Sequence, residues 1–423
     1  QMLMLRDTEI ETDLRAMATP IWRAAGIDPN GVTIYVVNDP SLNAFVAAGQ
    51  KLFIHSGLIV RTENASQLIG VIAHETGHMA GGHLVRQNEA VTSAMATSFL
   101  SILAGGAAAI ATKDPQALMA GTMAAQTLGE RQYLAFSRAI ESQADQAGMG
   151  FLNRTNQSAQ GFWQFMQILW QQDSQHMSPD PYFLTHPLSS ERMDRIQAFV
   201  QEHPDQRDVA DPNYNEMHAR IRAKLVGFLM SPSEVNRRYP PGDTSIAARY
   251  AHAIAQYRLP DVAGSLKIID SMIKDEPNNP YFWELKAQIL FDNNRIADAL
   301  PAWRQAVKLK PTAPLLRIDY VRASLELNDQ TLYDDALANL NEAAKTEDND
   351  AMLWRLYGII YGTRGQDGLA SEALARQALL EHRAKDAERL STRALKLLPY
   401  GSPAWLRAQD TSTDAQRMSK NGG

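Results

Sequence analysis

Two histidines four residues apart, His74 and His78, set the strongest constraint on the first half of this chain. They lie in the sequence HETGH, directly after the mostly apolar stretch QLIGVIA, and this pattern indicates a helix over residues 66–87. Because residues i and i+4 share one face of a helix, both imidazoles can bind one metal ion. Glu75 lies beside them and can take a proton from an attacking water. Neutral imidazole nitrogens suit Zn²⁺, so the sequence predicts a helix that carries a hydrolytic zinc centre.

A catalytic zinc site needs three protein ligands, so the histidine pair requires a third. His83 follows His78 by five residues, one residue too early for the three-histidine pattern with an intervening glycine. Glu141 is the better candidate, because Glu141 and Asp145 share one face of a helix predicted over residues 131–152. We predict that Glu141 binds the metal and that Asp145 accepts a hydrogen bond from a ligand imidazole.

Arg138 lies three residues before Glu141 and leaves two interpretations equally open. It either holds the two carboxylates in place, or it is a plain surface charge. The histidines His55, His83 and His176 are interpreted as structural or surface residues.

Composition narrows the classes of protein that fit these motifs. The formal net charge of −6 argues against a general nucleic-acid binder, which is usually basic. The absence of cysteine excludes a cysteine-only zinc site, a thiol nucleophile and a disulfide framework, and it fits an oxidising compartment. The chain begins at Gln1 without an apolar signal core, so we expect that a signal peptide was removed or that the chain was trimmed.

The uncharged segment 90–112 is the nearest candidate for a membrane span. It is rich in Ala, Gly, Ser and Thr, so its transfer into a membrane is only weakly favourable. We expect a helical hairpin, bent at Gly105 and Gly106, that is buried or covers a groove. A peripheral membrane contact stays open.

The predicted fold class is α+β, and the metal-binding motifs lie in a domain over residues 1–203. In this domain a small sheet packs against the two motif helices. Its expected strands cover residues 32–37, 43–46 and 51–55, and its other helices 8–25, 162–172 and 190–202.

The length of 423 residues favours two domains. Loop-forming residues and prolines accumulate over 204–243, which we interpret as a linker with a bridging helix at 216–230. Over residues 244–410 no strand is expected, and helices of about 14 residues follow one another. Residues 411–423 are expected to form a disordered tail.

Two stretches of the second half carry small residues and a proline at the same four positions. Counted from Pro280, positions 8, 20, 27 and 32 are Ala287, Ala299, Ala306 and Pro311. Counted from Gly368, they are Ala375, Ala387, Ala394 and Pro399. Small residues let paired helices cross closely, and the proline ends the second helix. The pattern predicts an all-α domain of tetratricopeptide repeats (TPR).

The two-histidine motif and the later Glu-x-x-x-Asp helix resemble the gluzincin peptidases, which include the heat-shock membrane protease HtpX, the CAAX prenyl proteases and the periplasmic BepA-like enzymes. The strand Asn43-Ala44-Phe45 and the segments Thr185-His186-Pro187 and Ser190-Glu191-Arg192 are also similar to parts of that family. The resemblance covers roughly residues 1–200. The BepA-like branch couples this peptidase to TPR repeats, and the lack of a convincing membrane helix favours that branch.

The resemblance implies a zinc-dependent endopeptidase with one Zn²⁺ per chain. His74, His78 and Glu141 would hold the metal, and Glu75 would be the general base. It further implies that His186 reaches the zinc or the oxyanion. As a zinc ligand His186 would keep the enzyme latent, and as an oxyanion donor it would assist turnover.

The same resemblance implies a role in envelope protein quality control in the periplasm. Substrates would be unfolded or misassembled polypeptides, laid as an added strand along Asn43, Ala44 and Phe45. The TPR region would recruit clients or dock an assembly machine, by family resemblance the outer-membrane assembly machinery.

A chaperone-like or scaffold module with a vestigial zinc site is the alternative from another functional class. Glu75 argues against it, because a structural zinc site needs no general base and has a closed ligand set.

Overall fold

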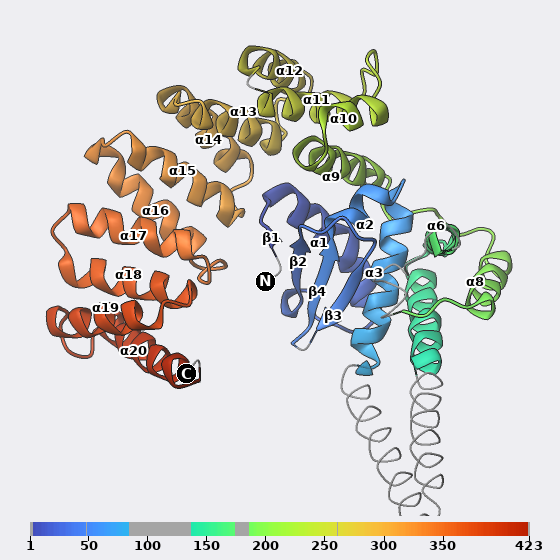
Figure 1. Cartoon of the computed structure of the whole chain (residues 1–423), viewed down its shortest axis with the longest axis horizontal. Coiled ribbons are helices and arrows are strands. Elements are labelled where there is room, and N and C mark those ends of the chain that lie inside the picture. Colours follow the sequence, from blue (N-terminus) through green and yellow to red (C-terminus); the bar gives the residue numbers. More distant parts are fainter. Residues whose placement is uncertain (1–2, 48, 84–136, 174–185, 260, 422–423) are drawn as a thin grey trace, which may run out of the picture. The chain divides into compact units, whose positions relative to one another are not determined.

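The computed structural model describes residues 3–47, 49–83, 137–173, 186–259 and 261–421 (Figure 1). The chain forms two compact units, residues 1–251 and 252–423. The first unit contains a four-stranded sheet and the motif helices, whereas the described part of the second unit contains helices only. The predicted α+β fold class is therefore confirmed.

The sheet has the strand order β1-β2-β4-β3. Its strands are β1 (Met4–Leu5), β2 (Thr33–Val37), β3 (Ala44–Ala47) and β4 (Lys51–His55). β2 and β4 are parallel, and β1 and β3 run antiparallel to their neighbours. Within the described parts of the chain β3 is therefore an edge strand, with one side of its backbone unpaired.

The two faces of the sheet differ in chemistry, because successive side chains of a strand point to opposite faces. One face buries aliphatic residues against α1 (Thr8–Ala24) and α3 (Ala65–Ala80). The other face carries the half-buried rings of Tyr35, Phe53 and Phe45. These rings stack in that order across the three strands, with neighbouring centroids 4.8 Å apart.

Further helices of the first unit surround this core. They are α2 (Ser56–Arg61), a helix over residues 137–154, α6 (Gln160–Asp173), α8 (Ser190–Glu202), α9 (Asn213–Leu229) and α10 (Pro232–Arg238), with a 3₁₀ turn at Pro29–Gly31.

The motif helix α3 is shorter than the predicted range 66–87. Asn64 caps its first turn by accepting a hydrogen bond from the backbone N–H of Gln67 at 3.0 Å. Its last helical residue is Ala80, because Gly82 has a φ of +60° in the left-handed region, which glycine adopts without strain.

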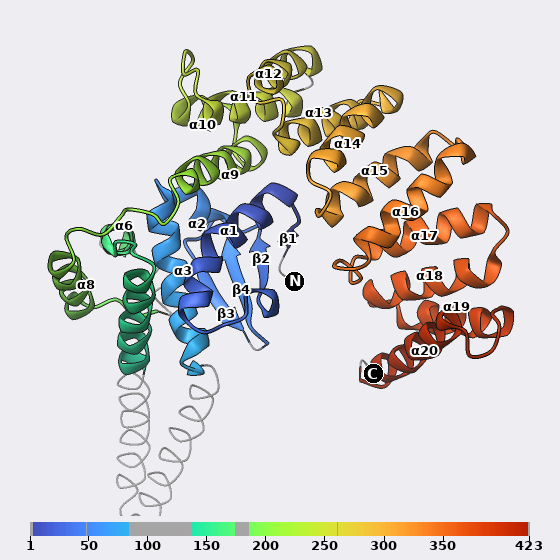
Figure 2. The ribbon, with the colours of Figure 1, turned by 180° about the vertical axis from the view of Figure 1, so that it is seen from behind.

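Glycines bring α3 and the helix 137–154 into backbone contact (Figures 1 and 2). A Cβ atom on Gly77 would lie 2.5 Å from the carbonyl oxygen of Ala144, and one on Gly148 would lie 3.0 Å from the backbone of Ala73. Larger residues at these two positions would force the helices apart. The close crossing therefore determines which residues of the second helix face the histidine pair.

Residues 204–243 were predicted to be a linker. In the structure, α9 of this segment packs against α1, α2 and α3 and is part of the first unit. Two cations of α9 approach the fully buried carboxylate of Glu9 in α1: Arg220 Nε at 2.9 Å and Lys224 Nζ at 3.5 Å. Tyr250 of α11 (Ile246–Arg258) donates a hydrogen bond to the same carboxylate at 2.7 Å. Such partners offset the cost of burying the charge, so the network holds α9 and the start of α11 to the first unit.

The second unit continues as consecutive antiparallel helices. They are α12 (Val262–Asp275), α13 (Pro280–Asp292), α14 (Ile296–Leu309), α15 (Pro314–Glu326), α16 (Tyr333–Ala343), α17 (Ala351–Thr363), α18 (Asp367–Leu380), α19 (Ala384–Leu397) and α20 (Pro403–Asn421), with a 3₁₀ turn at Gln330–Leu332.

The repeat pattern predicted from the sequence agrees with these helices. The starts of α11, α13 and α15 at residues 246, 280 and 314 give a period of 34 residues. The six alanines of the predicted pattern are all fully buried where neighbouring helices cross: Ala287, Ala299, Ala306, Ala375, Ala387 and Ala394. The predicted disordered tail is instead part of α20, which extends to Asn421 and packs against α18 and α19.

Of the helices that the structure describes, none has the length and apolar character needed to cross a membrane. The hairpin predicted over residues 90–112 lies outside the described residues.

Candidate metal centre

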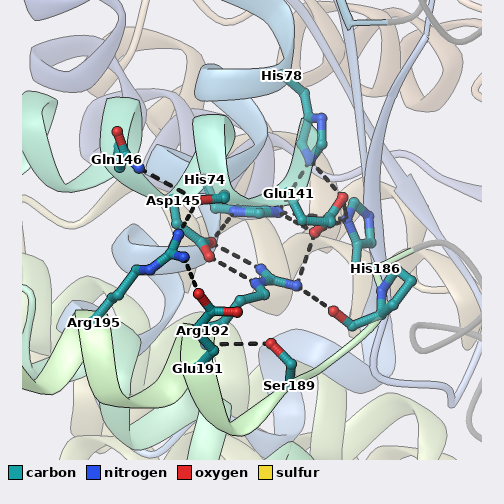
Figure 3. Close-up of polar contacts among 12 residues, drawn as sticks. His74, His78, Glu141, Asp145, Gln146, His186, Ser189, Glu191, Arg192 and Arg195 are labelled. Atoms are coloured by element: carbon teal, nitrogen blue, oxygen red, sulfur yellow. Dashed lines mark hydrogen bonds and ion pairs between the residues drawn. The ribbon is translucent and has the colours of Figure 1, made fainter. Parts of the chain in front are cut away.

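Four buried side chains converge on one point beside the sheet (Figure 3). His74 and His78 come from α3, Glu141 comes from the helix 137–154, and His186 lies four residues before α8. One potential ligand atom from each residue lies within 4.8 Å of all the others. The structure thus brings together the three ligands predicted from the sequence and His186, which the family resemblance implied would reach the zinc or the oxyanion.

The distances within this cluster fit a zinc ion. Tetrahedral zinc at about 2.0–2.1 Å from each ligand separates the ligand atoms by about 3.3 Å. The Nε2 atoms of His74 and His78 are 3.1 Å apart. Carboxylate oxygens of Glu141 lie 3.4 Å from His74 Nε2 and 3.3 Å from His78 Nε2. A donor set of imidazole nitrogens and one carboxylate is also the chemistry that zinc prefers.

Asp145 and Arg192 support the cluster from behind. Asp145 Oδ1 lies 2.9 Å from His74 Nδ1, which is the ring nitrogen away from the cluster. Arg192 of α8 donates two hydrogen bonds to the Asp145 carboxylate, at 2.7 and 2.8 Å. Its remaining terminal nitrogen lies 3.0 Å from Glu141 Oε2 and donates to the carbonyl oxygen of Pro187 at 2.8 Å. One guanidinium thereby fixes both carboxylates and the segment that carries His186.

Arg192 occupies the place that the sequence analysis considered for Arg138. Arg138 is exposed, whereas Arg192 is buried among the carboxylates. The signal for Arg192 was present in the sequence, because Ser190-Glu191-Arg192 belongs to the segment similar to the gluzincin family. Its contact with residues almost 50 positions earlier could not be read from helix periodicity.

The ionised carboxylates of the centre favour a positive charge between the four converging side chains. Burial lowers the pKa of His74, but Asp145 and Glu141 outweigh burial and raise this pKa to about 10. Burial would raise the pKa of Glu141, but the three neighbouring histidines hold this pKa well below its usual range. Asp145 is likewise kept ionised, because Arg192 and His74 lower its pKa against the effect of burial. A divalent cation suits these charges.

Glu75 lies beside the ligand cluster without taking part in its support. It is 1% exposed, and among the described residues neither of its carboxylate oxygens has a hydrogen-bond partner. Burial raises the pKa of Glu75, so this carboxylate takes up a proton more readily than an exposed one. An acceptor that is buried and unsatisfied is suited to receive a proton from a reactant.

His186 contacts both the ligand cluster and Glu75. Its Nδ1 lies 3.2 Å from both oxygens of Glu141 and 3.4 Å from His74 Nε2. Its Nε2 lies 3.5 Å from Glu75 Oε1. The ring of His186 is therefore the fourth member of the cluster, and it lies between the other three residues and Glu75.

His83, interpreted from the sequence as a structural or surface residue, lies against the centre. Its Nδ1 is 3.1 Å from Nδ1 of His78, and its side chain is buried. His55 is also buried and is bonded to Ser41 at 2.8 Å, which agrees with a structural role.

The predicted substrate strand lies at the edge of the sheet. Ala44 and Phe45 belong to β3, and Asn43 directly precedes it, with its carbonyl oxygen accepting a hydrogen bond from His55 N at 2.9 Å. β3 packs against α3, so this edge runs beside the helix that carries the two histidines.

Comparison with known proteins agrees with this geometry. Residues 5–200 match peptidase family M48. The β-barrel assembly-enhancing protease of Yersinia pestis is 24% identical over 361 residues, which is 81% of this chain and 70% of the relative. A putative β-barrel assembly-enhancing protease of Vibrio cholerae is 25% identical over 391 residues, covering 89% of this chain and 77% of the relative.

A similarity over a shorter stretch is found to a mitochondrial enzyme. A mitochondrial metalloendopeptidase of Schizosaccharomyces pombe is 27% identical over 181 residues, covering 42% of this chain and 49% of the relative. The family assignment, the donor set and the buried glutamate agree with one another. Residues 5–200 therefore form a zinc metallopeptidase domain of the family M48 type.

Proposed function

We propose that this chain is an endopeptidase that cleaves unfolded or misassembled polypeptides as part of envelope protein quality control in the periplasm. The observation that carries the proposal is the convergence of His74, His78 and Glu141 beside the unsatisfied carboxylate of Glu75. The names of two relatives, which refer to β-barrel assembly, support the biological setting. The absence of cysteine is consistent with an oxidising compartment.

In the proposed mechanism His74, His78 and Glu141 hold the metal. Zinc, when bound there, polarises the scissile carbonyl and lowers the pKa of a water. Glu75 accepts the proton of the attacking water and later delivers a proton to the leaving amine. The raised pKa of Glu75 suits both steps, because a base whose pKa is closer to the working pH can also return the proton.

The exchange of Glu75 for Gln separates catalysis from metal binding. Glu75→Gln keeps the size of the side chain but removes the base, so we expect full zinc content and a fall in casein hydrolysis of about 10²- to 10⁴-fold. Glu141→Gln is the matched variant, because it makes the same change in a second buried glutamate. For this variant we expect loss of zinc together with loss of activity.

Metal analysis and a hydrolysis assay measure both effects. Wild-type turnover by Glu75→Gln would show that Glu75 is not the base, and the chaperone-like alternative would then regain support. Full zinc retention by Glu141→Gln would remove Glu141 from the ligand set.

His186 is proposed to keep the enzyme latent. The contacts of its Nδ1 with Glu141 and His74 are as short as those among the three proposed ligands. A ring in that position would occupy the fourth coordination place that a catalytic zinc site leaves open. An oxyanion donor would instead lie further from the other ligands, within hydrogen-bond reach of a substrate oxygen at the fourth position. The short distances from His186 to Glu141 and His74 therefore favour the latent form.

We therefore expect His186→Ala to raise cleavage of denatured casein while zinc content stays unchanged. A rise of roughly tenfold is expected if His186 leaves the fourth coordination position of the metal free about a tenth of the time in the unmodified enzyme. His203→Ala, which changes a half-buried histidine at the end of α8, serves as the control. A lower rate in His186→Ala would identify His186 as an oxyanion donor, and an unchanged rate would remove it from the site.

The unpaired edge of β3 is proposed to bind the substrate as an added strand. Asn43 and His55 form a hydrogen-bonded pair, and such pairs alternate along an antiparallel ladder. Phe45 therefore directs its backbone groups toward β4, whereas those of Ala44 and Val46 point to the free edge. A peptide on this edge would bond to Ala44 and Val46 and place one residue opposite Phe45.

That residue would share a face with Phe45 and lie at the end of the aromatic stack described above. We expect the enzyme to favour a large apolar residue at this one position. Phe45→Thr should reduce the preference by about two- to tenfold, which corresponds to the 0.5–1.5 kcal/mol of an aromatic pair.

Mass spectrometry of the products from denatured casein measures this preference. Tyr35→Thr is the control, because Tyr35 belongs to the same stack but lies two strands away from the free edge. An equal loss in both variants would point to damage of the sheet, and no loss in Phe45→Thr would contradict the proposed register.

The repeat unit is proposed to recruit the protein client. Three large apolar side chains are exposed around the turn between α19 and α20: Leu397, Tyr400 and Leu406, of which Tyr400 is 87% exposed. Such a concentration of apolar surface is typical of a protein-binding site. Repeat arrays also present long surfaces to polypeptides.

We expect Leu397→Ser combined with Tyr400→Ser to weaken binding of a denatured outer-membrane β-barrel protein by roughly tenfold. Binding is measured by fluorescence anisotropy in the Glu75→Gln background, so that the client is not cleaved. Leu259→Ser is the control, because Leu259 is as exposed as Leu397, at 51%, but lies at the end of α11. Unchanged binding by the double variant would place the client elsewhere.

A further inference from the structure

The two histidines of the motif helix receive different support from their surroundings. His74 Nδ1 faces the carboxylate of Asp145 at 2.9 Å. His78 Nδ1 faces another imidazole, because Nδ1 of His83 lies 3.1 Å away. The two rings are nearly perpendicular, with an interplanar angle of 85°, and both side chains are more than nine-tenths buried.

The metal-facing atom of His78 determines how this contact works. Its Nε2 points to the cluster and must be unprotonated to bind a metal. The proton of the neutral ring then lies on Nδ1, which becomes a hydrogen-bond donor. The Nδ1 atom of His83 must be the acceptor, so the proton of His83 lies on its Nε2.

We propose that His83 is a positioning residue that fixes the tautomer and the orientation of His78 for zinc binding. A histidine ligand usually donates from its second nitrogen to a carboxylate, a backbone carbonyl or a water. Here a neutral imidazole takes that place. The inference rests on the proposed role of His78 as a zinc ligand.

The local sequence Gly81-Gly82-His83 makes the contact possible. α3 ends at Ala80, and the left-handed conformation of Gly82 takes His83 out of the register of that helix. A Cβ atom on Gly81 would lie only 2.2 Å from Nε2 of His83. The imidazole thus occupies the space above Gly81 that any other side chain would fill.

Zinc affinity tests the proposal without relying on activity. His83→Phe keeps an aromatic ring but removes the acceptor, and we expect the zinc dissociation constant to rise by about 10- to 100-fold. His83→Gln supplies a carbonyl oxygen and should recover most of the affinity. Competition with a chromogenic chelator measures the constant, and the absorption spectrum of the cobalt-substituted protein reports the geometry of the ligands.

A second variant disturbs the contact without touching a polar group. Gly81 has a φ of −75°, so Gly81→Ala is compatible with the backbone, and its methyl group must displace the His83 ring. We expect weaker zinc binding in Gly81→Ala. In a His83→Ala background the same change should have no further effect, because the ring is already gone.

His218→Phe is the matched control, because His218 is 1% exposed and bonded to Thr62 at 2.8 Å, away from the centre. It should leave zinc affinity unchanged. Unaltered affinity in His83→Phe would overturn the proposal, as would an equal loss in His83→Phe and His83→Gln. If His78→Ala itself kept full zinc affinity, the ligand assignment would fail instead.

Discussion

The backbone contact between α3 and the helix 137–154 is the constraint on which the metal centre depends. Gly77 and Gly148 allow the two helices to approach until one backbone touches the other. At that distance the short side chains of Glu141 and Asp145 reach opposite sides of His74. A wider crossing would leave the histidine pair without its third ligand. Gly77 therefore serves the packing of the two helices, whereas His74, Glu75 and His78 of the same motif face the proposed metal centre.

Charge balance explains why one arginine belongs to this centre. Three carboxylates, those of Glu75, Glu141 and Asp145, are almost fully buried there. Arg192 compensates one negative charge and leaves two, which equals the charge of a zinc ion. Since Arg192 also holds the carbonyl oxygen of Pro187, the same side chain ties the segment of His186 to the metal ligands.

Local periodicity was sufficient to predict α1, α6, α8, the strands β2, β3 and β4, and the three proposed ligands His74, His78 and Glu141. It failed wherever a contact depended on distant parts of the chain. Arg138 lies on the correct helix but points to solvent, whereas Arg192 arrives from α8. The packing of α9 depends on Glu9, more than 200 residues earlier, so loop-forming residues at its ends suggested a linker. His83 was set aside as a third ligand because it comes one residue too early for the three-histidine pattern, and spacing alone could not reveal its contact with His78.

The four residues of the cluster differ in how firmly the fold holds them. His74 and His78 are anchored by a helix and by a second contact from each ring, and Glu141 is held by Arg192. His186 lies outside the helices, four residues before α8, and its segment is held by the hydrogen bond from Arg192 to Pro187. The Nε2 atom of His186 also lies beside Glu75, so movement of this one ring would expose both the fourth place and the base. Three proposed ligands on helices and a fourth residue outside them fit the proposed latent form, in which the metal stays bound while activity changes.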